Sequence, residues 1–249
     1  MEHRVSSGGA LLHIAERGAP EGRAMLFLHG GLGALREMAP LAAEFPKARC
    51  LLMDTRGHGA SSLGQGRLTY QHLADDAAAV ISALGLERPL VIGHSDGGVI
   101  ALELAARGPS LAGVVSIGGS VAPPPPQAAA KFFLPLTAEF WRNRFPEDVA
   151  SYEAENPAPD FERLFDLVKA LWLDGGPGNY PVGIERIALP VLILNGDADE
   201  LVSRLETVAL AEAIPSAALA LIPYAGHMVH MEQSGLVAHA IRAMLDRLA

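Results

Sequence analysis

The sequence has one cysteine and no long hydrophobic run. Cys50 alone cannot form an internal disulfide, and its apolar neighbours in "CLLMD" indicate a buried thiol rather than a catalytic one. No apolar stretch approaches the length of a membrane-spanning helix. The stretch "MEHRVSSGGALLHIAERG" lacks the basic start and apolar centre of a secretory signal. We therefore expect a cytoplasmic protein that does not bind a membrane.

Positive charge is also scarce. Lys and Arg total 19 against 28 Asp and Glu, the net charge is −9, and no basic cluster of five or more residues occurs. Nucleic-acid binding needs a positive patch that neutralises phosphates, so this class of function is disfavoured. The hydrophobic content of 50%, in contrast, is sufficient for a large core and argues against disorder.

Motifs for bound cofactors are missing as well. No group of histidines has the spacing of metal ligands. The glycines of "GGLG" (30–33) lack the full G-x-G-x-x-G pattern of a dinucleotide site. We expect neither a metal nor an organic cofactor.

Six short apolar runs are present, and each ends in a loop rich in Gly, Asp or Ser. The runs are continuous rather than alternating, which is typical of strands buried on both faces. Helical patterns separate several of them. Strand alternating with helix predicts an α/β fold with a mostly parallel central sheet covered by helices. The runs occupy residues 24–31, 48–59, 89–95, 111–119, 190–200 and 218–227.

The alternation stops between about residue 121 and residue 187. This part opens with four prolines (123–126), which we expect to be extended, and continues with helical pieces that carry both tryptophans. We interpret 121–187 as an inserted helical cap over the carboxyl edge of the sheet, where α/β sheets bind ligands. Residues 1–120 and 188–249 then form the core domain. The alternative is a helical layer that only covers the core.

The stretch "GHSDGG" (93–98) places a serine between an apolar strand and a helical run. It fits the G-x-S-x-G pattern, in which a sharp turn lifts the serine side chain clear of the backbone. Glycines on both sides relieve the close contacts of such a turn. The helix that follows directs free N–H groups toward the serine. We therefore expect Ser95 to be a nucleophile.

A serine hydroxyl is a weak nucleophile and needs a neighbouring base. His227 follows the last strand and a turn-forming glycine, which places it at the same edge of the sheet as Ser95, whereas His230 could pack or face the pocket. The base in turn needs a carboxylate that holds its tautomer. "LILNGDADE" supplies three acids, of which we choose Asp199, because Asp197 is better suited to capping the turn.

Acyl transfer also requires donors for the developing oxyanion. The N–H of Asp96 qualifies because this residue immediately follows the nucleophile. The second donor should come from "HGGLG", where Gly31 is the first choice and Leu32 the alternative.

These stretches together resemble the α/β-hydrolase superfamily, in particular its small, cap-bearing esterases, lactonases and carbon–carbon hydrolases. The matching stretches are "FLHGGLG", "LLMDTRGHGASS", "LVIGHSDGG", "PVLILNGDADELV" and "IPYAGHMVHMEQ". The resemblance implies an α/β-hydrolase fold, with the nucleophile at Ser95, the acid at Asp199 and the base at His227. Family members with aspartate as nucleophile are dehalogenases or epoxide hydrolases, and Ser95 argues against both.

The sequence therefore predicts a serine esterase or lactonase that acts on a small to medium, mainly apolar substrate as a monomer or homodimer. Acidic substrates would need an arginine, for which Arg142 and Arg144 beside Trp141 are candidates. A carbon–carbon hydrolase, a perhydrolase or acyltransferase, and a slow-turnover ligand receptor remain alternatives. We expect substrate contacts from Leu32, His94, Phe133, Trp141, Trp172 and Met228.

Overall fold

A single eight-stranded sheet runs through the protein in the order β1-β2-β4-β3-β5-β6-β7-β8. The computed structural model describes residues 1–108 and 110–248. Strands β3 to β8 are parallel to one another, and β2 is antiparallel to both of its neighbours, β1 and β4. The strands are β1 (Glu2–Ser7), β2 (Ala10–Gly18), β3 (Ala24–Leu28), β4 (Arg49–Asp54), β5 (Leu90–His94), β6 (Gly113–Ile117), β7 (Val191–Gly196) and β8 (Ala217–Ile222).

The six apolar runs of the sequence correspond to β3 to β8, so the mostly parallel sheet is confirmed. The first two strands lie outside those runs. They form a hairpin whose turn is made by Gly8 and Gly9, both with positive φ (50° and 77°). A Gly-Gly pair between two short strands is typical of a hairpin, so the sequence contains a signal for these two strands that the prediction did not use.

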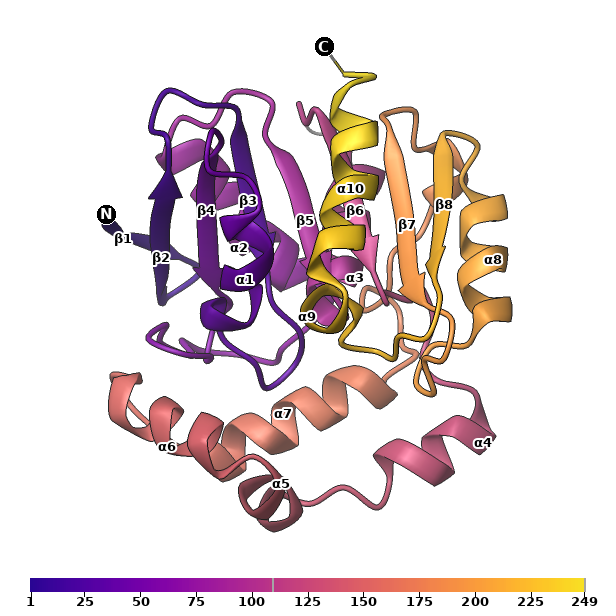
Figure 1. Ribbon diagram of the computed structural model, residues 1–249. Coiled ribbons are helices and arrows are strands. Elements are labelled where there is room, and N and C mark those ends of the chain that lie inside the picture. The colour runs from indigo at the N-terminus through magenta and orange to yellow at the C-terminus, as the bar shows by residue number, and fades with distance from the viewer. Residues whose placement is uncertain (109, 249) are drawn as a thin grey trace.

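Helices cover both faces of the sheet (Figure 1). One hydrophobic core packs under α2, α3 and α8, and a second packs under α1 and α10. Two faces of the same strands are buried in this way, which explains why their sequences are continuously apolar. The helices are α1 (Ala39–Ala43), α2 (Tyr70–Ala83), α3 (Asp96–Ala106), α8 (Arg204–Ala213), α9 (Val229–Glu232) and α10 (Ser234–Leu245), with a 3₁₀ turn, η1 (Leu35–Met38).

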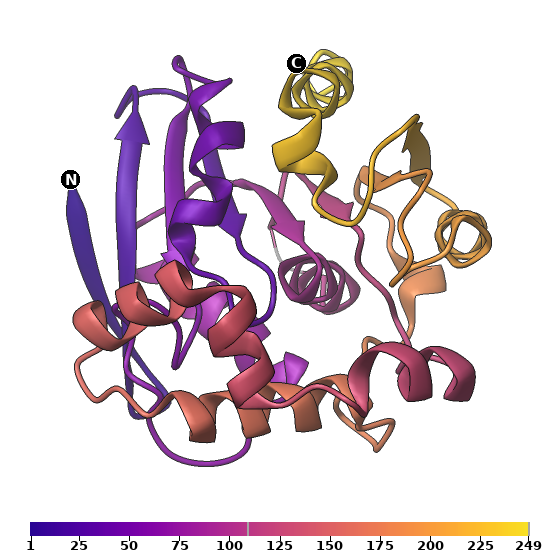
Figure 2. The ribbon, with the colours of Figure 1, turned by 60° about the horizontal axis from the view of Figure 1, so that its bottom comes forward.

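Four further helices lie between β6 and β7 along the chain, and they run below the carboxyl ends of the parallel strands (Figures 1 and 2). Helix α7 packs five buried apolar side chains into the first core. The expectation that all four prolines are extended is wrong for the last one, because Pro126 opens α4, where a missing N–H is tolerated. These elements are α4 (Pro126–Ala128), η2 (Ala129–Phe133), α5 (Ala138–Arg144), α6 (Pro146–Glu155), α7 (Phe161–Leu173) and η3 (Ile184–Arg186).

Among the helices within residues 1–108 and 110–248, none combines the length and the apolar character needed to cross a membrane.

Candidate active site

Ser95 lies at the sharp turn between β5 and α3. Its backbone is strained, with φ 51° and ψ −114°, a region that side-chain-bearing residues rarely adopt. The turn brings the backbone of β5 close to that of α3, and the start of α3 close to the end of β3. A Cβ on Gly93 would lie 1.9 Å from the carbonyl oxygen of Gly97, and a Cβ on Gly97 would lie 2.3 Å from that of Leu28. Only glycine fits at both positions, which is why the serine is flanked by them.

His227 and Asp199 meet at the same edge of the sheet. Asp199 follows β7 and His227 follows β8, and the His227 Nδ1 atom lies 2.7 Å from Asp199 Oδ2. The other carboxylate oxygen accepts the N–H groups of Leu201 (2.7 Å) and Val202 (3.1 Å). Burial acts to raise the pKa of Asp199, but the hydrogen bond and charge of His227 outweigh it, so the pKa is lowered and the carboxylate stays ionised.

Asp197 has a different partner. Its Oδ1 accepts the backbone N–H of Tyr224 at 2.7 Å and thereby fixes the turn that follows β8. Of the two aspartates weighed from the sequence, Asp199 is the one that contacts the imidazole.

Ser95 and His227 line one cavity of about 380 Å³. Because Nδ1 of His227 is bonded to Asp199, Nε2 is the ring nitrogen that remains for a proton from the serine. Among the described residues, no hydrogen bond joins Ser95 Oγ to this ring. Catalytic hydrogen bonds are often long in unliganded enzymes and shorten when substrate binds.

Two backbone N–H groups remain for an oxyanion. Asp96 is the first residue of α3, so its N–H has no acceptor within the helix. In the described chain, the N–H of Gly31 donates to no backbone carbonyl. The N–H of Leu32 is already used, because it donates to His58 Nε2 at 3.2 Å. Of the two donors left open by the sequence, Gly31 is therefore the one that is free.

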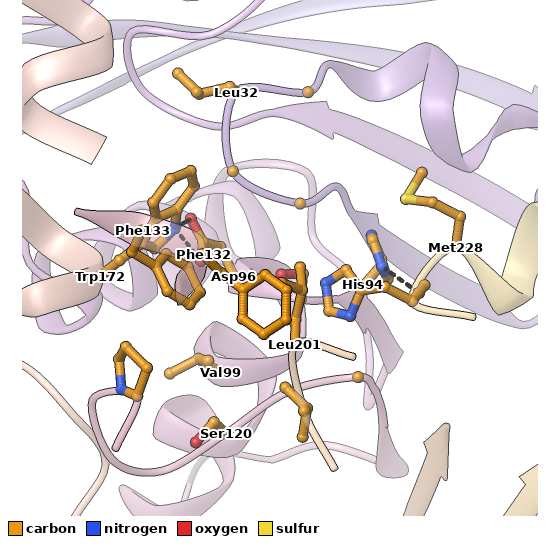
Figure 3. Close-up of a pocket in the computed structure, with 18 of the residues that line it drawn as sticks. Leu32, His94, Asp96, Val99, Ser120, Phe132, Phe133, Trp172, Leu201 and Met228 are labelled. Carbon is orange, nitrogen blue, oxygen red and sulfur yellow. Dashed lines mark hydrogen bonds between the residues drawn. The ribbon is translucent and has the colours of Figure 1, made fainter. Parts of the chain in front are cut away.

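The carboxyl group of Asp96 is a feature that sequence reasoning missed. It accepts hydrogen bonds from the Tyr70 hydroxyl (2.8 Å) and from Trp172 Nε1 (3.0 and 3.1 Å), as Figure 3 shows for Trp172. A Cβ on Gly31 would lie 2.5 Å from Asp96 Oδ2, so the carboxyl lies against the Gly30–Gly33 loop. Burial raises its pKa, although both donors oppose this. Only its backbone N–H entered the sequence prediction.

The sequence profile of the Alpha/beta hydrolase family matches residues 25–240 of the chain. The protein belongs to the α/β hydrolase family. A Haemophilus influenzae protein described provisionally as an esterase/lipase is 27% identical over 90% of this chain and 83% of its own. A Rhodobacter capsulatus protein described as the magnesium-chelatase 30 kDa subunit is 30% identical over 87% and 84% of the two chains.

Solved structures of other α/β hydrolases have the same fold. The enol-lactonase of Burkholderia xenovorans LB400 superposes with a TM-score of 0.78 at 21% identity over 98% of this chain and 100% of that one. A thermophilic esterase of Thermogutta terrifontis gives 0.74 at 25% identity over 100% and 99%. Together with the family match, they show the α/β-hydrolase fold that the sequence predicted.

The cavity of this α/β hydrolase is mostly apolar (Figure 3). All six residues expected to contact substrate line it, although His94 turns part of its ring toward Glu37 rather than toward the space. Lining residues that the sequence reading did not select include Tyr70, Val99, Phe132, Tyr180 and Leu201. They come from α2, α3, η2 and two loops, so no single stretch of sequence marks them.

Neither of the candidate arginines lines the cavity. Arg142 binds Glu162 and Glu153, and the guanidinium of Arg144 lies over the ring of Phe145. Among the described residues that line the cavity, no lysine or arginine is present, whereas four are acidic: Glu37, Asp96, Asp148 and Glu206.

Two further histidines shape the loops of this α/β hydrolase. His58 is buried, its pKa is lowered to about 3 by burial, and its Nε2 accepts from Leu32 N–H. His29 Nε2 accepts from the N–H of Thr55, and its Nδ1 lies 2.7 Å from the carbonyl of Gly30. His29 thus links the loop that follows β4 to the backbone at Gly30.

Proposed function

We propose that the protein is a cofactor-independent serine hydrolase that cleaves a carboxylic ester or lactone through an acyl-enzyme on Ser95. The observation that carries the proposal is the hydrogen bond between Asp199 and His227, whose ring lines the same cavity as Ser95 at its strained turn. This arrangement supplies a nucleophile, a base and a carboxylate that orients the base, which is the combination that makes a serine reactive.

In this mechanism Ser95 Oγ attacks the carbonyl carbon while His227 Nε2 takes its proton. The N–H groups of Gly31 and Asp96 stabilise the oxyanion, and the imidazolium stays paired with Asp199. His227 then protonates the leaving oxygen, and the carbonyl reforms as the acyl-enzyme. A water molecule that gives its proton to the same nitrogen hydrolyses this ester and restores the serine.

The cavity supports a small to medium, mainly apolar and uncharged substrate. Aromatic and aliphatic side chains dominate its wall, and its charged groups are acidic. We assign substrate contacts to Leu32, His94, Phe133, Trp141, Trp172 and Met228. In this proposal residues 121–187 form the cap, and residues 1–120 with 188–249 form the core domain.

The relatives favour one alternative. A Serratia proteamaculans protein described as a 2-succinyl-6-hydroxy-2,4-cyclohexadiene-1-carboxylate synthase is 25% identical over 93% of this chain and 96% of its own. Carbon–carbon bond chemistry, or acyl transfer to an acceptor other than water, on the same three residues is therefore the second candidate. The lack of a lysine or arginine in the described cavity wall counts against substrates with a carboxylate.

The test is the Ser95→Ala variant, assayed with p-nitrophenyl esters and lactones of increasing chain length. We expect turnover to fall to the background rate, while substrate still binds, and labelling by a fluorophosphonate to disappear. Multiple turnovers by the wild-type protein distinguish an enzyme from a slow ligand receptor. Retention of ester hydrolysis by Ser95→Ala would refute the serine mechanism.

A further inference from the structure

Behind the proposed base lies a buried cluster that the mechanism above does not use. It consists of Glu37 from η1, His94 from the end of β5, and His230 from α9. The side chains of His94 and His230 are 2% and 0% exposed, and their rings lie 4.1 Å apart, whereas Glu37 is 12% exposed because it also lines the cavity. His94 directly precedes Ser95 and His230 closely follows His227, so the cluster joins the segments of two proposed catalytic residues.

His94 is bonded at both ring nitrogens. Its Nε2 lies 3.0 Å from the backbone carbonyl oxygen of His227, and its Nδ1 lies 2.7 Å from Glu37 Oε1. A carbonyl oxygen can only accept a hydrogen bond, so Nε2 must carry a proton. An ionised carboxylate also only accepts, so the second bond requires a further proton, either on Nδ1 or on the carboxyl group of Glu37.

The pair therefore holds one proton more than a neutral imidazole and a carboxylate would. In either placement of that proton the pair has no net charge, which is the low-cost way to bury two ionisable groups. Burial acts to raise the pKa of Glu37, but the facing His94 and His230 outweigh it and hold the pKa well below its ordinary value. Burial and the neighbouring His230 lower the pKa of His94 as well, which opposes an imidazolium. The two shifts therefore do not assign the proton to one partner, and the hydrogen-bond geometry alone requires that one of them carries it.

Glu37 also contacts the loop of residues 30–33, here called the oxyanion loop because it carries the proposed donor Gly31. Its Oε1 accepts the N–H of Gly30 at 3.1 Å, one residue before the proposed donor Gly31. A Cβ on Gly33 would lie 2.4 Å from Glu37 Oε2, so the carboxyl runs directly beneath the loop. One carboxyl thus contacts the loop of the oxyanion donor and, through His94, the backbone of His227.

We propose that Glu37 and His94 are positioning residues, which share one buried proton and fix the oxyanion loop and the base loop relative to Ser95. This inference rests on the proposed serine mechanism, because it concerns the alignment of that site. Neither residue exchanges atoms with the substrate. Their effect is on the alignment of the reacting groups, for which a displacement of about 1 Å costs on the order of 100-fold in rate.

The principal test compares Glu37→Ala with Glu37→Gln. A glutamine NH₂ in place of Oε1 can donate to His94 Nδ1 and so retain the link to the His227 carbonyl without a shared proton, although it can no longer accept the Gly30 N–H. Alanine removes both contacts. We expect Glu37→Ala to lower kcat about 100-fold with KM changed by less than about threefold. Glu37→Gln should recover at least about tenfold of this loss. Glu44→Gln, at an exposed glutamate bonded to Arg242, is the matched control and should leave kcat unchanged.

The pH profile separates positioning from a merely structural role. The wild-type link needs the shared proton, so kcat should decline on the alkaline side as that proton is lost. Glu37→Gln needs no such proton and should lack this decline. The titratable groups facing the pair are His230, His227, Asp96 and His58. All four remain in both proteins, so a difference between the two profiles belongs to residue 37.

Several results would overturn the proposal. They are equal loss of kcat in the two Glu37 variants, an effect on KM alone, or an unchanged alkaline decline in Glu37→Gln. Stoichiometric divalent metal in the purified protein that is lost in Glu37→Gln would do so too, since a metal would then replace the proton. If Glu37→Ala does not fold, the pH profile of kcat in the nearly isosteric Glu37→Gln tests the proposal by itself.

A measurement on the resting protein keeps this inference distinct from the serine mechanism. In proton NMR spectra, the proton shared between His94 Nδ1 and Glu37 should give a far-downfield signal that is lost in His94→Gln and in Glu37→Ala but persists in Ser95→Ala. Persistence of the signal with undiminished turnover in Ser95→Ala would refute the serine mechanism and leave the buried pair intact. Absence of the signal from the wild-type protein would refute the pair.

Discussion

At the scale of single residues, the environment of each carboxyl group determines what it does. Asp199, Asp197 and Asp96 all lie near the carboxyl ends of strands. Asp199 contacts the imidazole of His227, Asp197 holds the turn after β8, and Asp96 is buried and accepts hydrogen bonds from two side chains. Spacing in the sequence could place all three at the site, but only their hydrogen bonds distinguish their roles.

Replacement of Asp199 by asparagine tests the orienting role. The change keeps the size of the side chain but removes the charge that stabilises the imidazolium and fixes its tautomer. We expect kcat to fall by about 10⁴-fold, the value known for the corresponding change in a serine protease, with little change in the unfolding midpoint. Steady-state kinetics and denaturation measure the two effects.

Asp197→Asn is the control, since an amide oxygen can still accept the Tyr224 N–H. Near-normal turnover in Asp199→Asn together with inactivity in Asp197→Asn would reverse the assignment.

The raised pKa of Asp96 predicts that the stability of the protein depends on pH. Burial raises its pKa above the ordinary value of 3.8, so between that value and the raised one the folded state binds more protons than the unfolded chain. Stability contributed by the protonated form is therefore full below pH 3.8 and is lost as the pH rises through the raised pKa. The loss is about 1.4 kcal/mol for each unit by which the pKa is raised.

Asp96→Asn cannot ionise and should lack this contribution, so its stability relative to wild type should increase with pH. Urea unfolding across the acidic to neutral range measures the difference, with the exposed Asp166→Asn as control. A constant difference between Asp96→Asn and wild type would contradict the expectation.

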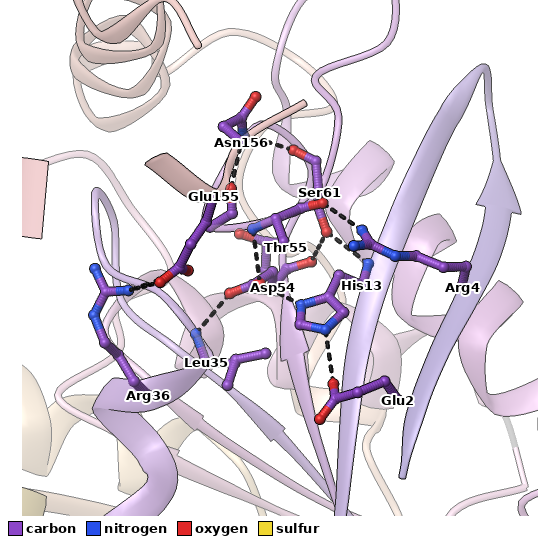
Figure 4. Close-up of polar contacts among 12 residues, drawn as sticks. Glu2, Arg4, His13, Leu35, Arg36, Asp54, Thr55, Ser61, Glu155 and Asn156 are labelled. Carbon is purple, nitrogen blue, oxygen red and sulfur yellow. Dashed lines mark hydrogen bonds and ion pairs between the residues drawn. The ribbon is translucent and has the colours of Figure 1, made fainter. Parts of the chain in front are cut away.

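At the scale of elements, polar contacts tie the segments around the site together (Figure 4). Asp54, at the end of β4, binds His13 of β2 through Oδ2 at 2.8 Å and accepts the Leu35 N–H of η1 through Oδ1 at 2.8 Å. His13 also contacts Glu2 of β1 at 2.8 Å. The unpredicted hairpin is thus connected to the 3₁₀ turn that carries Glu37.

Asn156 connects the helical segment to the core in the same way. Its side-chain amide donates to the carbonyls of Gly57 (3.2 Å), Gly59 (2.9 Å) and Ser61 (2.9 Å) in the loop after β4. Nearby, the exposed Arg36 lies 3.4 Å from Glu155. A buried amide with several acceptors fixes geometry more strongly than an exposed ion pair does.

We therefore expect Asn156→Ala to destabilise the protein by about 2–4 kcal/mol, since buried carbonyls lose their donor. Arg36→Ala should cost no more than about 1 kcal/mol, because its partners are exposed. Chemical denaturation of both variants provides the comparison. Equal effects of the two substitutions would show that the amide does not anchor this segment.

At the scale of the whole molecule, charge bears on substrate choice. The chain carries a net charge of −9, and the described wall of the cavity contains four acidic residues but no lysine or arginine. A negative cavity of low polarity repels anions, and this repulsion weakens as salt screens it.

A neutral ester and an anionic ester of the same length test this point. We expect kcat/KM to be at least about tenfold lower for 4-nitrophenyl hemisuccinate than for 4-nitrophenyl butyrate, with the gap narrowing as salt is added. Rates in Ser95→Ala give the background for both substrates. Equal or better turnover of the anion would favour a substrate that bears a carboxylate.

The sequence by itself determined the parallel sheet, the family and the stretches that supply the site. Continuous apolar runs reveal strands buried on both sides, and glycines around Ser95 reveal a turn that other residues cannot make. Both constraints act between residues close together in the sequence, so they can be recognised from the sequence of one chain.

The tertiary structure alone decided which groups meet. The contacts of Asp96 with Tyr70 and Trp172, and of Glu37 with His94 and Gly30, join residues separated by between 7 and 76 positions. No periodicity links such positions, because side chains of different strands and helices come together only when the sheet and its covering helices have packed.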